Sequence, residues 1–118
     1  MAADPELQGR QEAFKRIVTR NGCQIHDDPL DCEYPIQACH LIPKSALKKR
    51  GLKEYFWDPR NALGACYKAH RRSDAGLERF PVERIPDAAW DFATELGLDY
   101  MLENLYGKRE LDRPDPAL

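Results

Sequence analysis

The sequence predicts a single α+β domain, with two short strands and a helix between an N-terminal helix and two C-terminal helices. Three observations support this prediction. Apolar residues repeat at helical spacing near both ends, residues 36–42 and 61–65 resemble short strands, and a helix-forming stretch follows the second strand directly. The 118 residues, 42% hydrophobic and 32% charged, suit one globular domain with a modest core.

The first helix is predicted over residues 5–20, where Pro5 fits the first turn. Its apolar residues repeat at helical spacing, namely Leu7, Phe14, Ile17 and Val18. Asn21-Gly22 ends this helix, which we interpret as a packing element. Residues 23–35 show no periodicity and contain the turn signal Asp27-Asp28-Pro29.

The central strands and helices are predicted from the residues that begin or end them. The strand over residues 36–42 carries His40 near its end and stops at Pro43. Ser45 can cap a short helix through residues 47–50, which Gly51 ends. After the second strand, a helix over residues 67–75 is closed by Gly76.

The C-terminal third is predicted to form two packing helices over about residues 86–107. Pro86 opens the first, and Asp99 can cap the second. Apolar residues follow the helical period in both, namely Ala89, Trp90, Ala93, Leu96, Met101, Leu102, Leu105 and Tyr106. The tail over residues 108–118 is predicted to be disordered.

The charge is unevenly distributed although the net charge is only −2. Residues 41–84 hold 11 Lys and Arg against 5 Asp and Glu, whereas both flanking segments are acidic. This layout fits a phosphate-facing site, and it also fits a solvated surface of mixed charge. No apolar run is long enough for a membrane span, and the polar, acidic start does not resemble a signal peptide. We therefore expect a cytoplasmic protein with no membrane partner.

The central stretch carries side chains that suit phosphodiester hydrolysis, which needs a base, a cation and a held phosphate. His40 can serve as the base, and the amide of Asn61 can hold either that imidazole or a backbone group. His70 and Asp74 lie four residues apart on one helix face and offer nitrogen and oxygen ligands to one divalent metal ion, such as Mg2+, Mn2+ or Zn2+. Four basic residues are near enough in sequence to contact phosphates, namely Lys44, Lys68, Arg71 and Arg72. Taken singly, each of these residues has an ordinary structural or surface role as the alternative.

Four cysteines in a cytoplasmic chain indicate thiols or metal ligands rather than disulfides. Cys23 and His26 have the spacing of half a zinc site. Cys32 is either a further ligand or a small buried side chain.

These residues resemble the HNH endonuclease family, whose fold is called ββα-metal. The resemblance rests on Cys39-His40-Leu41-Ile42-Pro43-Lys44-Ser45, on Asn61-Ala62-Leu63, and on Ala65-Cys66-Tyr67-Lys68-Ala69-His70. It covers roughly residues 23–107, with the ββα-metal core at about 23–76. Residues 85–98 also resemble the end of small HNH proteins encoded by bacteriophages.

The resemblance implies His40 as general base, Asn61 as the orienting residue, and His70 and Asp74 as metal ligands. Cys39 stands where the family often has a His or Asp ligand, and a thiolate there would favour Zn2+ or Mn2+ over Mg2+. Ala69 replaces the second cysteine of the usual zinc knuckle. Structural zinc would therefore need a substitute ligand from His26 or Cys32, and otherwise these side chains and the thiols of Cys23 and Cys66 are buried packing groups.

The expected function is thus metal-dependent DNA cleavage or nicking, with DNA as the partner. One alternative is a non-catalytic protein that keeps the fold and binds DNA or phage packaging machinery. Another is a purely structural module held together by zinc.

Overall fold

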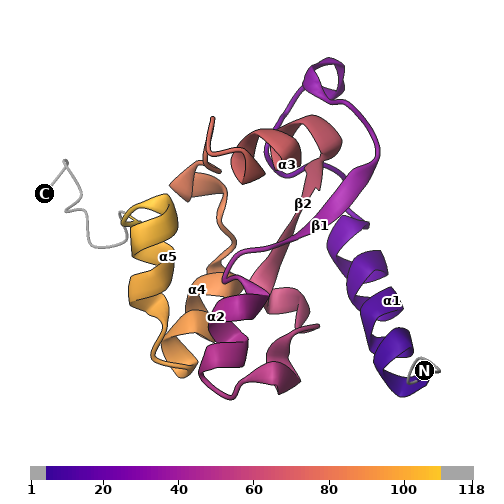
Figure 1. Cartoon of the computed structure of the whole chain (residues 1–118). Helices are drawn as coiled ribbons and strands as arrows, with labels where there is room; N and C mark the ends of the chain where they lie inside the picture. Colours follow the sequence, from indigo (N-terminus) through magenta and orange to yellow (C-terminus); the bar gives the residue numbers. More distant parts are fainter. Residues whose placement is uncertain (1–4, 110–118) are drawn as a thin grey trace, which may run out of the picture.

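The computed structural model describes residues 5–109. This part of the chain is α+β, with one two-stranded antiparallel sheet and five α-helices (Figure 1). The elements are α1 (Pro5–Thr19), β1 (Ile36–His40), α2 (Lys44–Lys49), β2 (Ala62–Cys66), α3 (Tyr67–Asp74), α4 (Asp87–Glu95) and α5 (Asp99–Tyr106). Short 3-10 helices occupy Pro29–Asp31, Lys53–Tyr55, Pro59–Asn61 and Val82–Arg84. Most of the tail that was predicted to be disordered, residues 108–118, lies outside the described residues.

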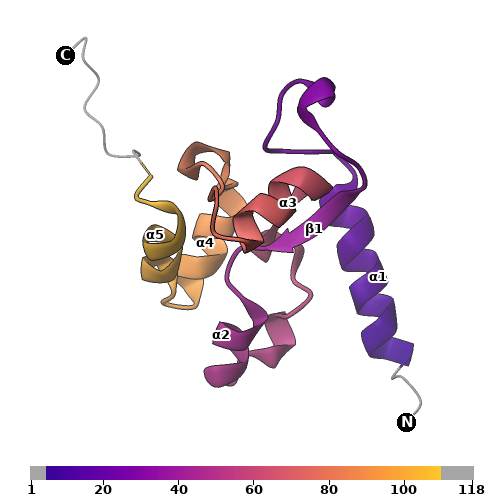
Figure 2. The same cartoon turned by 45° about the horizontal axis from the view of Figure 1, so that its top comes forward.

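β1 and β2 form a hairpin with a long connection, which contains α2 and two of the 3-10 helices. Ile36 pairs with Cys66 at one end, and His40 pairs with Ala62 at the other. α3 begins at the residue that follows β2 and packs against both strands (Figure 2). The start of α3 therefore lies beside the start of β1, where the N–H of Tyr67 donates to the carbonyl of Pro35.

The predicted boundaries differ from the observed ones at several points, of which three concern the central elements. β1 ends at His40 rather than at residue 42, and β2 is displaced by one residue from the predicted strand over 61–65. Asn61 instead closes a 3-10 helix that begins after Asp58, whose carboxylate accepts a hydrogen bond from the backbone N–H of Arg60. α2 starts at Lys44 with Pro43 before it, so Ser45 lies inside the helix and does not cap it.

The hairpin is covered on its two faces by different parts of the chain (Figure 1). α1 packs on one face, where Phe14 and Val18 meet Ala62 in a small cluster. The other face packs with α3, α4 and α5 in a larger hydrophobic core. The fully buried side chains of this core include Leu41, Ile42, Leu47, Leu63, Cys66, Phe92, Ala93 and Leu102.

Gly64 in β2 permits the close approach of α1. A Cβ atom at this position would lie 2.6 Å from the carbonyl oxygen of Gly22 and 2.9 Å from that of Val18. Both distances are shorter than carbon–oxygen contacts allow, so only glycine fits there. Across the described residues, no helix has the length and apolar character needed to cross a membrane.

Candidate functional site

A cavity of about 500 Å³ lies along β1, between α1 and α3. His40 from the end of β1 and His70 from α3 both line it. The remaining lining residues are Gln11, Phe14, Lys15, Thr19, Ile36, Gln37, Ala38, Lys44 and Trp57. The structure therefore brings the predicted base and one predicted metal ligand to the same hollow.

The ring of His40 is held on several sides. It stacks on Phe14 with ring centroids 4.9 Å apart and meets the edge of Trp57 at 5.6 Å. Its Nε2 lies 2.7 Å from the carbonyl oxygen of Phe56. Because a carbonyl oxygen only accepts, the proton between them sits on Nε2, and Nδ1 of the neutral ring keeps its lone pair.

Burial lowers the pKa of His40, and the nearby Lys44 and His70 lower it further. The hydrogen bond to Phe56 opposes this shift without cancelling it. An imidazole normally titrates near 6.5, so His40 is neutral at physiological pH and able to accept a proton. This protonation state is the one that a general base requires.

Asn61 holds a backbone group, one of the two roles predicted for its amide. Its Oδ1 accepts a hydrogen bond from the N–H of Ile42 at 2.8 Å, and its Nδ2 donates to the carbonyl of Ile42 at 2.9 Å. The side chain is almost completely buried, at 1% exposure. Asn61 thus fixes the turn that follows His40, rather than the imidazole itself.

Asn61→Ala is expected to destabilise the fold. The substitution leaves two buried backbone groups of Ile42 without partners, at about 1–3 kcal/mol for each. Chemical denaturation should show the loss as a lower transition midpoint. Asn21→Ala, at an exposed position, is the matched control and should change the free energy of unfolding by less than about 0.5 kcal/mol. Equal stability of both variants would remove the structural role assigned to Asn61.

His70 and Asp74 face one another across one turn of α3, as their spacing predicts. Nε2 of His70 lies 3.3 Å from Oδ2 of Asp74. The other ring nitrogen, Nδ1, lies 2.7 Å from Oε1 of Gln37 on β1. Gln37 was not among the predicted site residues, and only the strand pairing reveals that it reaches α3.

Cys39 is not placed with this pair. Its side chain is 2% exposed, belongs to the larger core and does not line the cavity. The thiol donates to the carbonyl of Gln37, with the sulfur 3.7 Å from the oxygen, and burial raises its pKa to about 12. The physical reason is the alternation of side chains along β1, which sends Cys39 to the face opposite that of His40. Cys39, His70 and Asp74 do not form a three-ligand group in the described part of the chain.

The predicted phosphate contacts separate into two places. Lys44 lines the cavity, with its Nζ 4.8 Å from the centre of the Trp57 ring. On α3, Arg71 lies over the ring of Tyr67, and Arg72 pairs with Glu78 of the segment that follows the helix. Neither arginine lines the cavity, and Lys68 does not line it either. Lys15 of α1 does line it, although the sequence indicated only a packing role for this helix. The apolar spacing of α1 predicted Phe14 but gave no sign that the next residue faces a site.

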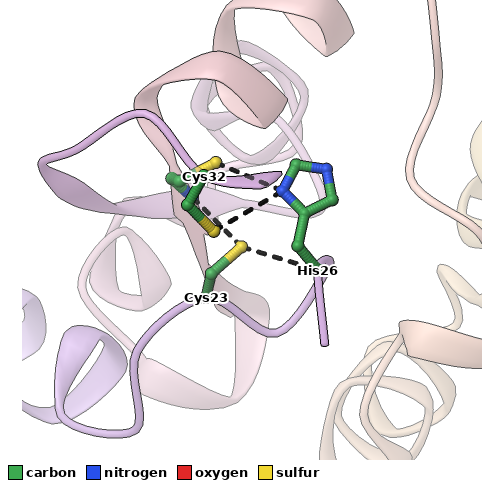
Figure 3. A group of neighbouring side chains, drawn as sticks. Cys23, His26 and Cys32 are labelled. Carbon is green, nitrogen blue, oxygen red and sulfur yellow. Dashed lines mark hydrogen bonds between the residues drawn. The ribbon is translucent and has the colours of Figure 1, made fainter. Parts of the chain in front are cut away.

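A second group of side chains gathers at the other end of the hairpin. Cys23, His26, Cys32 and Cys66 place their ligand atoms within 4.8 Å of one another. Figure 3 shows the side chains of Cys23, His26 and Cys32 turned toward a common centre. Nδ1 of His26 lies 3.5 Å from the sulfur atoms of both Cys32 and Cys66. We call this group the Cys3His cluster. It can bind a metal ion, so the structure brings together the residues whose role the sequence left open.

Long-range folding completes the cluster. Cys66 closes β2, while Cys23 and His26 lie on the segment after α1. Cys32 follows the 3-10 helix Pro29–Asp31, which turns the chain back toward the others. Ala69, one turn into α3, is buried in the core and is not part of the cluster. Two hydrogen bonds between Gln24 and Gly64 tie the same segment to β2.

Two cysteines of the cluster have pKa values shifted in opposite directions. Burial acts to raise the pKa of Cys23, but hydrogen bonds from the backbone N–H groups of His26, Cys66 and Ile25 and from the thiol of Cys32 together lower it. For Cys32, burial and the neighbouring Cys66 and Cys23 raise the pKa to about 12. Sulfur atoms this close cannot all ionise without a cation between them, and a metal ion bound here would supply that charge.

Comparison of the chain with protein-family models, with curated proteins and with solved structures finds no significant match.

Proposed function

We propose that the protein is a metal-dependent DNA endonuclease and that β1, β2 and α3 form a ββα-metal unit of the HNH type. The observation that carries the proposal is the state of His40. Its Nε2 donates a hydrogen bond to the carbonyl of Phe56, and its Nδ1 keeps a lone pair that can accept a proton. The ring lines the cavity that His70 and Lys44 also line. Such a group can take a proton from water beside a bound phosphodiester.

Three residues of the chain have separate roles in the proposed reaction. His40 takes a proton from water as the water oxygen bonds to phosphorus, and the phosphorus–oxygen bond to the leaving nucleotide breaks. Asn61 keeps the turn after His40 in place, and Lys44 offers a positive charge to a phosphate oxygen. The leaving oxygen then takes up a proton from solvent.

His70 and Asp74 fit a divalent ion, because a nitrogen and a carboxylate oxygen 3.3 Å apart form a mixed pair. Such a pair suits Mn2+ or Zn2+, and the carboxylate also admits Mg2+. A divalent ion bound there would neutralise negative charge on the phosphate and on the leaving oxygen.

The Cys3His cluster has a different role in this proposal. Three sulfur ligands and one imidazole are the set that Zn2+ prefers, and four protein ligands leave no position open for a substrate. We assign it a structural zinc ion that fastens the segment after α1 to the junction of β2 and α3.

The alternative function is a non-catalytic protein of the same fold that binds DNA or phage packaging machinery. The burial of Cys39 favours this alternative, because it leaves His70 and Asp74 as a two-residue site. Cleavage of supercoiled plasmid with Mg2+, Mn2+, Zn2+ or a chelator tests the two functions. Metal-dependent nicking supports the endonuclease, whereas DNA binding without cleavage under any metal supports the alternative.

Lys44→Ala is expected to weaken DNA binding and to reduce the salt slope of the affinity by about one, because one phosphate contact releases about one counterion. Arg72→Ala is the matched control, since Arg72 pairs with Glu78 away from the cavity. Affinities measured over a range of salt concentrations give both slopes. A larger loss of affinity in Arg72→Ala than in Lys44→Ala would mean that DNA binds the side of α3 that carries Arg72, away from the cavity.

A further inference from the structure

Gln37 occupies a position on β1 that faces α3. The strand pairing sets Gln37 opposite Ala65, and its side chain lines the same cavity as His40 and His70. Its amide oxygen lies 2.7 Å from Nδ1 of His70, the usual distance of a strong hydrogen bond. The partly buried pair joins residues 33 positions apart in sequence.

This hydrogen bond decides where the proton of His70 sits. An amide oxygen can only accept, so Nδ1 of His70 carries the hydrogen. In the neutral form of the ring with its hydrogen on Nδ1, Nε2 keeps a lone pair. Nε2 lies 3.3 Å from the carboxylate oxygen Oδ2 of Asp74. Two acceptors at this distance attract a cation between them.

The distance also fits two ligands of one ion. Metal–nitrogen and metal–oxygen bonds of about 2.0–2.1 Å place neighbouring ligands about 2.9–3.4 Å apart, depending on whether the geometry is octahedral or tetrahedral. The observed 3.3 Å lies within this range. The pair on α3 is thus spaced for coordination before any ion is added.

We propose that Gln37 is a positioning residue, which holds His70 in the Nδ1–H tautomer so that Nε2 and Asp74 can share one divalent cation. The inference rests on the proposed metal site of the endonuclease and names the residue that prepares it. Such partners on the far nitrogen of a ligating histidine commonly fix the ring orientation.

Without Gln37, His70 and Asp74 can form a hydrogen bond with each other. The proton of His70 moves to Nε2 and is donated to Asp74, which occupies both ligand atoms at once. A cation would then have to displace this hydrogen bond. The expected result for Gln37→Leu is a divalent-ion affinity weaker by about 10–100-fold.

Calorimetric titration with Mn2+ tests the inference, on full-length protein that already carries one equivalent of Zn2+. Gln37→Leu should weaken Mn2+ binding, whereas Gln37→Glu should restore it, because a carboxylate also accepts from Nδ1. Gln11→Leu is the matched control, since Gln11 lines the cavity from α1. Unchanged Mn2+ affinity in Gln37→Leu would overturn the inference, as would an equal loss in Gln11→Leu.

The ring tautomer provides a readout that needs neither metal nor activity. Two-bond 1H–15N NMR spectra of the neutral ring should show the Nδ1–H form of His70 in the wild type and the Nε2–H form in Gln37→Leu. An Nε2–H wild type would overturn the role of Gln37 whatever the cleavage result. Tautomer and Mn2+ results as expected, with no cleavage of DNA, would instead keep this inference and reject the endonuclease.

Discussion

His40→Gln is expected to lower the rate of metal-dependent DNA cleavage by about 10²–10⁴-fold, the usual contribution of a positioned general base. Glutamine keeps an N–H for the carbonyl of Phe56 and fills much of the space between Phe14 and Trp57. It does not accept a proton at neutral pH. Single-turnover cleavage of supercoiled plasmid measures the loss directly, without a contribution from product release.

Two further measurements separate chemistry from folding and binding in this variant. DNA affinity and the thermal midpoint should stay close to those of the wild type, because a base acts in the transition state. The wild-type rate should fall as the pH drops through the lowered pKa of His40, where the ring gains a proton and loses its acceptor. Wild-type cleavage rates in His40→Gln would exclude His40 from the reaction.

Cys66→Ser is expected to abolish binding of the proposed zinc ion and to unfold most of the chain at physiological temperature. Structural zinc sites in small peptides contribute about 10–16 kcal/mol, which is comparable with the whole stability of a small domain, about 5–15 kcal/mol. Zinc content by elemental analysis and thermal unfolding with and without a chelator measure the two effects.

Cys39→Ser provides the matched control for this experiment, because Cys39 is a buried thiol outside the Cys3His cluster. A serine hydroxyl can still donate to the carbonyl of Gln37. The variant should keep one zinc per chain and lose only about 1–2 kcal/mol of stability. A chain that stays folded and monodisperse after Cys66→Ser would mean that the cluster has no structural zinc.

Local rules were sufficient for much of the fold. The helical spacing of Phe14 and Val18 predicted α1, and the four-residue spacing of His70 and Asp74 predicted their contact. The predicted strand that carries His40 is present as β1, although it is shorter. These features depend on residues within one or two turns of each other, which a sequence displays directly.

The rest of the candidate site depends on contacts between distant segments. Cys32 reaches the cluster through a turn whose path no periodicity describes, and Gln37 meets His70 only through the register of the hairpin. The resemblance offered Cys39 as a ligand, but the alternation of β1 turns it into the core. Lys15 lines the cavity next to Phe14, whose ring packs on His40 across the contact between α1 and β1.

The hydrogen bond between the sulfur of Cys23 and the N–H of Cys66 spans 43 positions of the chain, so an ion in the Cys3His cluster closes a loop of that length. His40 and Asn61 both lie inside the loop. Gathering the same ligands from an unfolded chain would cost about 4 kcal/mol of chain entropy, by the relation used for cross-links. Because the folded chain has already closed this loop, the proposed zinc ion is expected to bind it about a thousandfold more tightly. When zinc is scarce, uptake of the ion and ordering of the enclosed residues should therefore occur as a single cooperative event.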